Sequence, residues 1–209
     1  MSATLYGTPI STYVRTVRLV LESANVDYAI QDVGIFNGDN EADEYLSKHP
    51  FGKIPTLEID GTTLYETDAI TYYINEKYAS GKFKPADTLQ QARMYQIISI
   101  FNNYLYWPAV RVLTIENLVV PSQGGEPDKE KIRDAITPAQ NAFKAIADIA
   151  SFHPYLLGDQ LTLADFYLIP AFKYVSLTPQ YKQVTESVPQ LREWYKEVRS
   201  LDIVKKVCS

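Results

Sequence analysis

The stretch from Thr56 to Tyr78 constrains the fold more than any other, because it reads as a β-hairpin that leads directly into a helix. Residues 56–59 and 62–65 are short runs rich in Thr, Leu, Ile and Tyr, and the Asp60-Gly61 pair between them is a strong signal for a two-residue hairpin turn. Behind the second run, apolar side chains recur at the spacing of an α-helix. The pattern predicts two antiparallel strands and a helix that begins near Thr67.

The residues before this hairpin predict a βαβ unit. Ala3–Tyr6 is a short apolar run, residues 12–24 have the period of an amphipathic helix, and residues 28–33 alternate as a second strand does. Two strands separated by one crossover helix should be parallel. With a further short helix at 42–48, residues 1–80 read as an α/β domain of order βαβ-α-ββα.

The rest of the chain predicts an all-helical second domain. The polar, Gly- and Pro-containing residues 81–88 form the expected linker, so the second domain runs over residues 89–209. We expect Pro108 to kink or split its first helix, and Thr162 with Asp165 to form a capping box. The expected helices cover 89–118, 127–150, 161–174 and 189–201, with a loop at 120–128.

Composition excludes several kinds of function. The net charge of -5 and the absence of a Lys/Arg cluster argue against nucleic-acid binding. Cys208 is the only cysteine, which excludes an internal disulfide, and with two distant histidines it predicts no metal site. The start of the chain has neither a charged nor an apolar leader region, and no apolar run approaches membrane-spanning length. We therefore expect a cytosolic protein that does not enter a membrane.

The string HPFGKIPTLEIDG, followed by LYETDAITYYI, resembles the glutathione-binding half of the glutathione S-transferase family. The family pattern is Pro-Phe-Gly-(Gln/Lys)-(Ile/Val)-Pro, a hairpin, then Glu-Ser-x-Ala-Ile; Thr67 stands where Ser is usual and keeps the hydroxyl. GDQLTLADF resembles a buried structural motif of the same family. The resemblance is dense up to Tyr78 and continues as a pattern afterwards. It implies a thioredoxin-like domain followed by an all-α domain, with glutathione as cosubstrate and no other cofactor.

Ser11 is the candidate catalytic residue. It lies between a strand and a helix, where a hydroxyl residue is ordinarily a helix cap. YGTPISTYVRTV resembles the phi class and related fungal transferases, in which a Ser at this position donates a hydrogen bond to the sulfur of glutathione. A free thiol has a pKa of about 8.5, and a hydroxyl donor at the positive end of a helix favours the thiolate. Tyr6 and Tyr13 remain alternatives for this role.

The resemblance also implies which residues hold the peptide part of glutathione. It implies a cis bond between Ile54 and Pro55, with the Ile54 backbone paired to the cysteinyl residue like an added strand. Glu66 would pair with the γ-glutamyl ammonium, and Thr67 would bind the carboxylate at the start of its helix.

The glycine carboxylate of glutathione needs a cation or an amide. Lys53 is the candidate cation, and Asn40 is a second donor. Here the chain departs from the plant phi pattern, because Asn40 and Glu41 replace a basic pair and Asp68 replaces a frequent Arg. These departures bear on the assignment to the phi class more than on glutathione as the ligand.

Tyr106, Trp107 and Arg111 give the long helix an aromatic, partly polar stripe near Pro108. Such a stripe is either core or the lining of an apolar cleft for the electrophile. Ile10 and Phe36 are expected to contribute to the same cleft.

These observations predict a homodimeric glutathione S-transferase that conjugates glutathione to small hydrophobic electrophiles, with a compatible peroxidase side activity. Phe51 resembles the aromatic key by which many family members lock into a partner subunit; the alternative is burial within its own domain. Two rival functions stay open. One is a non-catalytic assembly module like the N-terminal domain of elongation factor 1 gamma, and the other is a carrier (ligandin) of small hydrophobic molecules.

Overall fold

The computed structural model describes residues 3–35 and 37–209, and the chain divides into two compact units. The first unit holds the residues up to Phe83 together with Asp202–Ser209, and the second unit is Lys84–Leu201. The last eight residues therefore belong to the first unit, although the sequence analysis assigned them to the helical domain.

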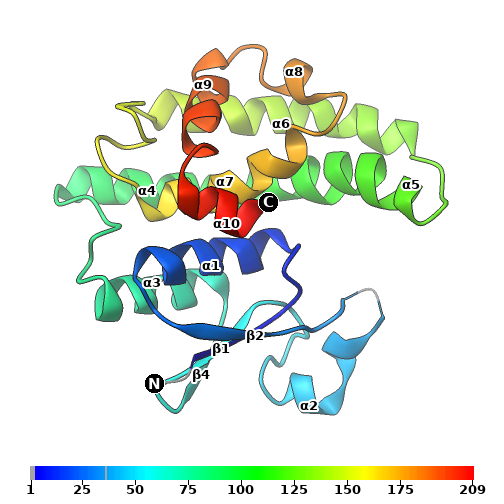
Figure 1. Cartoon of the computed structure of the whole chain (residues 1–209). Helices are drawn as coiled ribbons and strands as arrows, with labels where there is room; N and C mark the ends of the chain where they lie inside the picture. Colours follow the sequence, from blue (N-terminus) through cyan, green and yellow to red (C-terminus); the bar gives the residue numbers. More distant parts are fainter. Residues whose placement is uncertain (1–2, 36) are drawn as a thin grey trace. The chain divides into compact units, whose positions relative to one another are not determined.

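A four-stranded mixed sheet forms the centre of the first unit (Figure 1). Its order is β2-β1-β3-β4, with β1 (Ala3–Tyr6) parallel to β2 (Tyr28–Gln31) and antiparallel to β3 (Thr56–Ile59), which pairs antiparallel with β4 (Thr62–Tyr65). α1 (Thr12–Ser23) and α3 (Thr67–Tyr78) cover one face, and α2 (Asp43–Leu46) lies at the other. The predicted α/β arrangement is confirmed.

The hairpin turn and the strand alternation explain this sheet. Asp60 and Gly61 both have positive φ, 54° and 74°, as a turn matched to the twist of the strands requires. Leu5 pairs with Leu57, and both are fully buried on the side of α1 and α3. Tyr6, the next residue, points to the opposite face.

α10 (Asp202–Cys208) is a helix that the sequence analysis missed, and it packs against α1 within the first unit (Figure 1). Val204 and Val207 are 3% and 2% exposed, respectively. Lys206 Nζ lies 2.7 Å from Glu22 Oε2 on α1. The prediction that the last helix ends at 201 was wrong, because a seven-residue helix carries too little periodicity to be recognised without its packing partner.

The second unit is all-helical, as predicted. Its helices are α4 (Thr88–Ile100), η2 (Phe101–Val119), α5 (Val120–Ser122), α6 (Lys129–Ile149), α7 (Leu163–Val175), α8 (Tyr181–Val184) and α9 (Pro189–Val198). α7 is the most buried of them, and α6 packs along η2. The predicted capping box of Thr162 and Asp165 is present at the start of α7. α8 was not predicted, and α5 shows that the predicted loop at 120–128 begins three residues later.

Pro108 does not split the long helix. From Phe101 onward the helix widens to i→i+5 hydrogen bonds, as the bond from the Val120 N–H to the Ile115 carbonyl illustrates. Thr114 Oγ1 likewise reaches back five residues, to the Ala109 carbonyl at 3.0 Å. A wider helix has room for a proline ring that would clash with the preceding turn of an α-helix. The change in helix type replaces the expected break.

Within the described residues, no helix combines the length and apolarity needed to cross a bilayer.

Candidate active site

Ser11 caps the N-terminus of α1. Its backbone is extended, at φ -65° and ψ 135°, and Oγ accepts a long hydrogen bond of 3.5 Å from the Val14 N–H. Because Oγ accepts in this bond, the hydroxyl proton is not used by it. Gly7 is required just upstream, since its φ is +143° and a Cβ there would lie 2.6 Å from Val14 Cγ2. The tight turn after β1 thus places Ser11 at the positive end of the helix.

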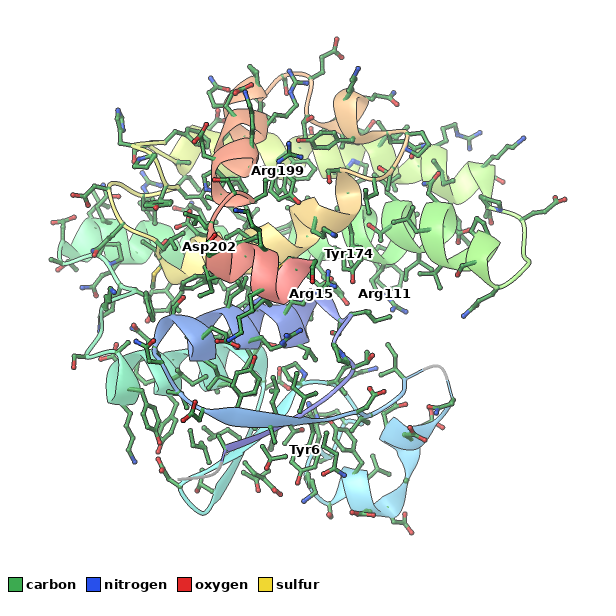
Figure 2. The ribbon with its side chains drawn as sticks, in the orientation of Figure 1. Tyr6, Arg15, Arg111, Tyr174, Arg199 and Asp202 are labelled. Atoms are coloured by element: carbon green, nitrogen blue, oxygen red, sulfur yellow. The ribbon has the colours of Figure 1, made fainter. Side chains whose placement is uncertain are left out.

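The hydroxyl of Tyr6 is already engaged elsewhere. It donates to Glu58 Oε2 at 2.6 Å, while Lys48 Nζ lies 2.5 Å from Glu58 Oε1 and 4.9 Å from the Tyr6 ring centroid. The bond to Glu58 is the main cause that raises the pKa of Tyr6, and burial adds to it. Figure 2 shows Tyr6 on the side of the sheet away from α1. These contacts argue against Tyr6 as the thiol's partner, whereas Tyr13 lies half-buried in the first turn of α1.

The segment before β3 contains the expected cis bond between Ile54 and Pro55, which confirms that prediction. Lys53 precedes it with an exposed side chain, and the Lys53 carbonyl accepts a 2.6 Å hydrogen bond from the Tyr45 hydroxyl. The same hydroxyl lies 3.0 Å from Thr56 Oγ1. Tyr45, buried on α2, therefore ties both sides of the Ile54–Pro55 bond to one anchor.

Asn40 supports this segment from a short helical turn, η1 (Asp39–Glu41). Its Nδ2 donates to the Gly52 carbonyl at 2.8 Å. Gly52 has φ +57°, and a Cβ there would lie 2.8 Å from the Asn40 carbonyl oxygen, so the two backbones meet closely. One amide proton of Asn40 is thus used to hold the residue before Lys53.

Glu66 and Thr67 form the start of α3. Glu66 has φ 68° and ψ 117°, a strained conformation for a residue with a side chain, and its side chain does not cap the helix. Thr67 is 9% exposed, and its carbonyl accepts a 2.9 Å bond from Thr71 Oγ1. Strained backbone of this kind is concentrated at functional sites. An uncapped helix N-terminus beside an exposed carboxylate suits a ligand that carries both signs of charge.

The strand register brings these segments together. Thr56 pairs with Tyr6 on β1 and with Tyr65 on β4. Three segments therefore meet at one edge of the sheet. They are the segment that leads from β1 to Ser11, the segment with Ile54 and Pro55 that enters β3, and the segment that leaves β4 at Glu66. Three candidate segments, distant in sequence, share one place in the first unit.

Tyr106, Trp107 and Arg111 lie on η2 in the second unit. Trp107 is 66% exposed, so it is not a core residue. Tyr106 is half-buried, which raises its pKa, and Arg111 is its hydrogen-bonding neighbour. Ile10 is exposed on the first unit, and Phe36 lies outside the described residues.

Phe51 is 67% exposed, so the alternative of burial within its own domain was wrong. Its ring contacts those of His49 and Tyr65, at centroid distances of 6.1 and 6.4 Å. His49 is 2% exposed, and its Nδ1 accepts from the Phe51 N–H at 3.3 Å. The buried imidazole thus supports an aromatic side chain that projects into solvent.

Arg15 escaped the sequence analysis. It lies on the buried face of α1, next to Val14, and is 6% exposed. Its Nε donates to the Pro9 carbonyl at 3.1 Å and its Nη2 to the Ser209 carbonyl at 3.3 Å. An arginine within an apolar helical stripe was the signal available in the sequence.

The chain matches two family models. Residues 5–82 match the glutathione S-transferase N-terminal domain, and residues 129–197 match the C-terminal domain. Glutathione S-transferase hmp2 of Hypomyces subiculosus is 30% identical over 195 residues, which covers 91% of this chain and 90% of that protein. Glutathione S-transferase F13 of Arabidopsis thaliana is 27% identical over 212 residues, which covers 99% and 95%.

A solved structure agrees with the sequence matches. The crystal structure of glutathione transferase F7 from Populus trichocarpa has a TM-score of 0.85 and 30% identity, and the match covers 98% of this chain and 97% of that one. The relatives thus include plant phi-class enzymes and a fungal transferase. The chain belongs to the glutathione S-transferase family and is a glutathione transferase.

Proposed function

We propose that Ser11 donates a hydrogen bond to the sulfur of bound glutathione, which lowers the pKa of the thiol so that the thiolate is the nucleophile at neutral pH. The observation that carries this proposal is the position of Ser11 at the α1 N-terminus, where its Oγ accepts a long bond of 3.5 Å from the Val14 N–H. Each pKa unit by which the site lowers the thiol requires about 1.36 kcal/mol of preference for the thiolate. A hydroxyl donor and a helix N-terminus both supply that preference.

The peptide of glutathione then lies along the sheet edge described above. Ile54 pairs its backbone with the cysteinyl residue, and Glu66 and Thr67 bind the γ-glutamyl ammonium and carboxylate. Lys53 is exposed and its side chain neutralises the glycine carboxylate. Asn40 acts mainly by holding Gly52, because its Nδ2 is bonded to that carbonyl.

The reaction is a transfer of the glutathionyl group. The thiol proton passes to solvent, the sulfur attacks an electrophilic carbon, a carbon–sulfur bond forms, and the leaving group departs with its electron pair. Ser11 does not itself attack. We propose Tyr106, Trp107 and Arg111 as the residues that receive the electrophile, because exposed aromatic surface with one cation suits an apolar molecule that carries a polar group.

The same thiolate also reduces organic hydroperoxides. The thiolate of one glutathione attacks the terminal peroxide oxygen, the O–O bond breaks, and glutathione sulfenic acid and an alcohol form. The thiol of a second glutathione then attacks the sulfenic sulfur, which forms the disulfide and releases water, so two thiols are oxidised for each peroxide reduced. We place both reactions in the cytosol, where thiols stay reduced.

Binding and thiol ionisation are separated by one experiment on wild type, Ser11→Ala and Tyr13→Phe. Thermal stabilisation by glutathione reports binding, and the thiolate absorbance of the complex against pH reports the pKa of the thiol. We expect all three proteins to be stabilised, with the thiolate signal at neutral pH lost only in Ser11→Ala. A loss confined to Tyr13→Phe would move the role to that residue.

The wild type also decides the rival functions. If millimolar glutathione neither stabilises the wild type nor ionises in its presence, the proposed glutathione site fails, and the assembly module and the carrier are left. If glutathione binds without turnover of any electrophile, while hydrophobic dyes bind tightly, the chain is a carrier.

We further propose a homodimer in which Phe51 inserts into the partner subunit. The support is its 67% exposure on a rigid aromatic base of His49 and Tyr65. Phe51→Ser should give a monomer by sedimentation, and Tyr72→Ser, which alters another exposed aromatic residue, is the control. If Phe51→Ser is still a dimer, the proposal that Phe51 inserts into the partner subunit is wrong.

A further inference from the structure

We propose that Arg15 is a positioning residue for Ser11, and that the main-chain carbonyl of Ser209 holds the Arg15 guanidinium in place. This inference rests on the proposed role of Ser11. It makes the C-terminal segment part of the thiol-activating machinery, although no atom of that segment needs to touch glutathione.

Hydrogen bonds connect Arg15 to the loop that carries Ser11. The Nε of Arg15 donates to the Pro9 carbonyl at 3.1 Å, and Pro9 lies two residues before Ser11. The Arg15 N–H also closes the first helical turn on the Ser11 carbonyl at 2.9 Å, while the Ser11 N–H binds the Thr8 carbonyl at 3.0 Å. The Arg15 side chain thus holds this loop at Pro9, and backbone hydrogen bonds hold it at Ser11.

The other end of the guanidinium is held by Ser209, the residue that follows α10. Nη2 of Arg15 donates to the Ser209 carbonyl at 3.3 Å. α10 delivers that carbonyl because it packs on α1 with Val204 and Val207 buried, and because Lys206 pairs with Glu22 at 2.7 Å. The C-terminus of the chain and the first turn of α1 lie close together in Figure 1, and Figure 2 labels Arg15 at that point.

The geometry requires arginine rather than any cation. A guanidinium is a planar fork with fixed donors and can bridge two carbonyls that lie in different directions, whereas an ammonium on a flexible stem cannot hold both in the same geometry. A misplacement of about 1 Å in a positioned group can cost on the order of 10²-fold in rate. Fixing the Pro9–Ser11 loop therefore fixes the hydroxyl against the sulfur. The buried positive charge beside it further favours the thiolate.

The test compares Arg15→Lys with the control variant Arg18→Lys. Arg18 lies on the same helix, but its Nε donates to the Tyr28 hydroxyl at 3.2 Å. Each protein is titrated with glutathione to obtain Kd, and the thiolate absorbance of the complex is followed against pH. We expect Arg15→Lys to bind glutathione within about threefold of wild type but to raise the pKa of the bound thiol by about one unit, so that kcat falls about tenfold below the midpoint. Arg18→Lys should leave the pKa and kcat unchanged.

A second variant tests the Ser209 half of the proposal. A chain that ends at Cys208 should raise the pKa of the bound thiol in the same direction, and in the Arg15→Lys background the deletion should add nothing. Additive effects of the two changes would overturn the coupling between Arg15 and Ser209.

The remaining outcomes are equally decisive. If Arg15→Lys keeps the wild-type pKa of the bound thiol, or loses activity only in proportion to its folded fraction, then Arg15 is a structural residue and the inference fails. If Ser11→Ala also keeps the wild-type pKa, the proposed function has failed instead. If the pKa of the bound thiol rises in Ser11→Ala but not in Arg15→Lys, the proposed role of Ser11 holds and the inference about Arg15 fails.

Discussion

The Tyr6 hydroxyl donates to Glu58 Oε2 at 2.6 Å, across the β1–β3 pair and on the face of the sheet away from α1. Because its hydroxyl proton is used in this bond, we expect Tyr6 to stabilise the sheet and not to act on the glutathione sulfur. Tyr6→Phe should lower the free energy of unfolding by about 1 kcal/mol, because it removes a bond to a carboxylate that is partly open to solvent.

The same variant should leave the pKa of bound glutathione unchanged. Urea unfolding and the thiolate titration check the two statements separately. A thiol pKa raised in Tyr6→Phe as far as in Ser11→Ala would give Tyr6 a role at the sulfur.

Glu66 offers a prediction in which stability and function move in opposite directions. Its φ of 68° with ψ 117° is strained for any residue with a Cβ, at a typical cost of about 1–3 kcal/mol. Glu66→Gly relieves that strain but makes the unfolded chain more flexible, which offsets about 0.5–1 kcal/mol. We expect a net gain of about 1 kcal/mol in urea unfolding.

Glutathione affinity should nevertheless fall on the order of tenfold in Glu66→Gly, since the γ-glutamyl ammonium would lose the carboxylate that we propose as its partner. Glu66→Gln, which keeps the strain and removes only the charge, is the matched control. It should weaken binding without stabilising the fold, and a gain of stability in both variants would show that strain is not the cause.

Asp60 predicts a pH dependence of stability. Its Oδ2 lies 2.7 Å from Lys77 Nζ and accepts from the Tyr78 and Tyr73 hydroxyls, and these donors, Lys77 foremost, lower its pKa from 3.8 to about 2. A carboxyl with a depressed folded pKa stabilises the fold at pH values above its unfolded pKa, and that contribution is lost as the pH falls through the folded pKa. The difference in urea midpoint between wild type and Asp60→Asn should therefore be constant above about pH 5 and shrink from pH 3.8 toward about 2. Two midpoint curves that stay parallel through this range would contradict the assignment.

Asp165 should be the most sensitive polar position of the second unit. Its carboxylate accepts from the Leu156 N–H, the Trp194 Nε1–H, and both the N–H and hydroxyl of Thr162, at 2.8–3.0 Å. Complete burial raises its pKa, while these four donors favour the charged form. Asp165→Asn sets an amide donor against existing donors and should cost about 3 kcal/mol in unfolding free energy. Thr162→Val removes one donor, the hydroxyl, and keeps the backbone N–H, so it opposes no other donor and should cost about 1 kcal/mol. Equal losses in the two variants would argue against donor conflict.

Local signals explain which parts of the fold the sequence could predict. The strands β1, β3 and β4 were predicted residue for residue, because the Asp60-Gly61 turn and the alternation around it depend only on neighbours in the chain. The family string identified the cis bond and the start of α3. The φ of Glu66 could not be predicted, since nothing in its own residue type demands it.

Long-range contacts explain the rest. α10 is recognisable only once α1 is there to cover Val204 and Val207. The position of Arg15 within an apolar helical stripe is visible in the sequence, but its partners, the Pro9 and Ser209 carbonyls, are known only from the fold. Pro108 was expected to kink or split its helix, and only the packed unit shows that the helix widens around it.

Because α10 belongs to the first unit, that unit cannot complete its folding until the second unit has been synthesised. During synthesis the sheet, α1 and α3 leave the ribosome early, yet the helix that covers α1 is made only after the whole second unit. At about 5–20 residues per second, the nascent first unit waits on the order of ten seconds with that face of α1 uncovered. A chaperone that binds this exposed apolar stripe would therefore meet the nascent transferase before α10 covers α1.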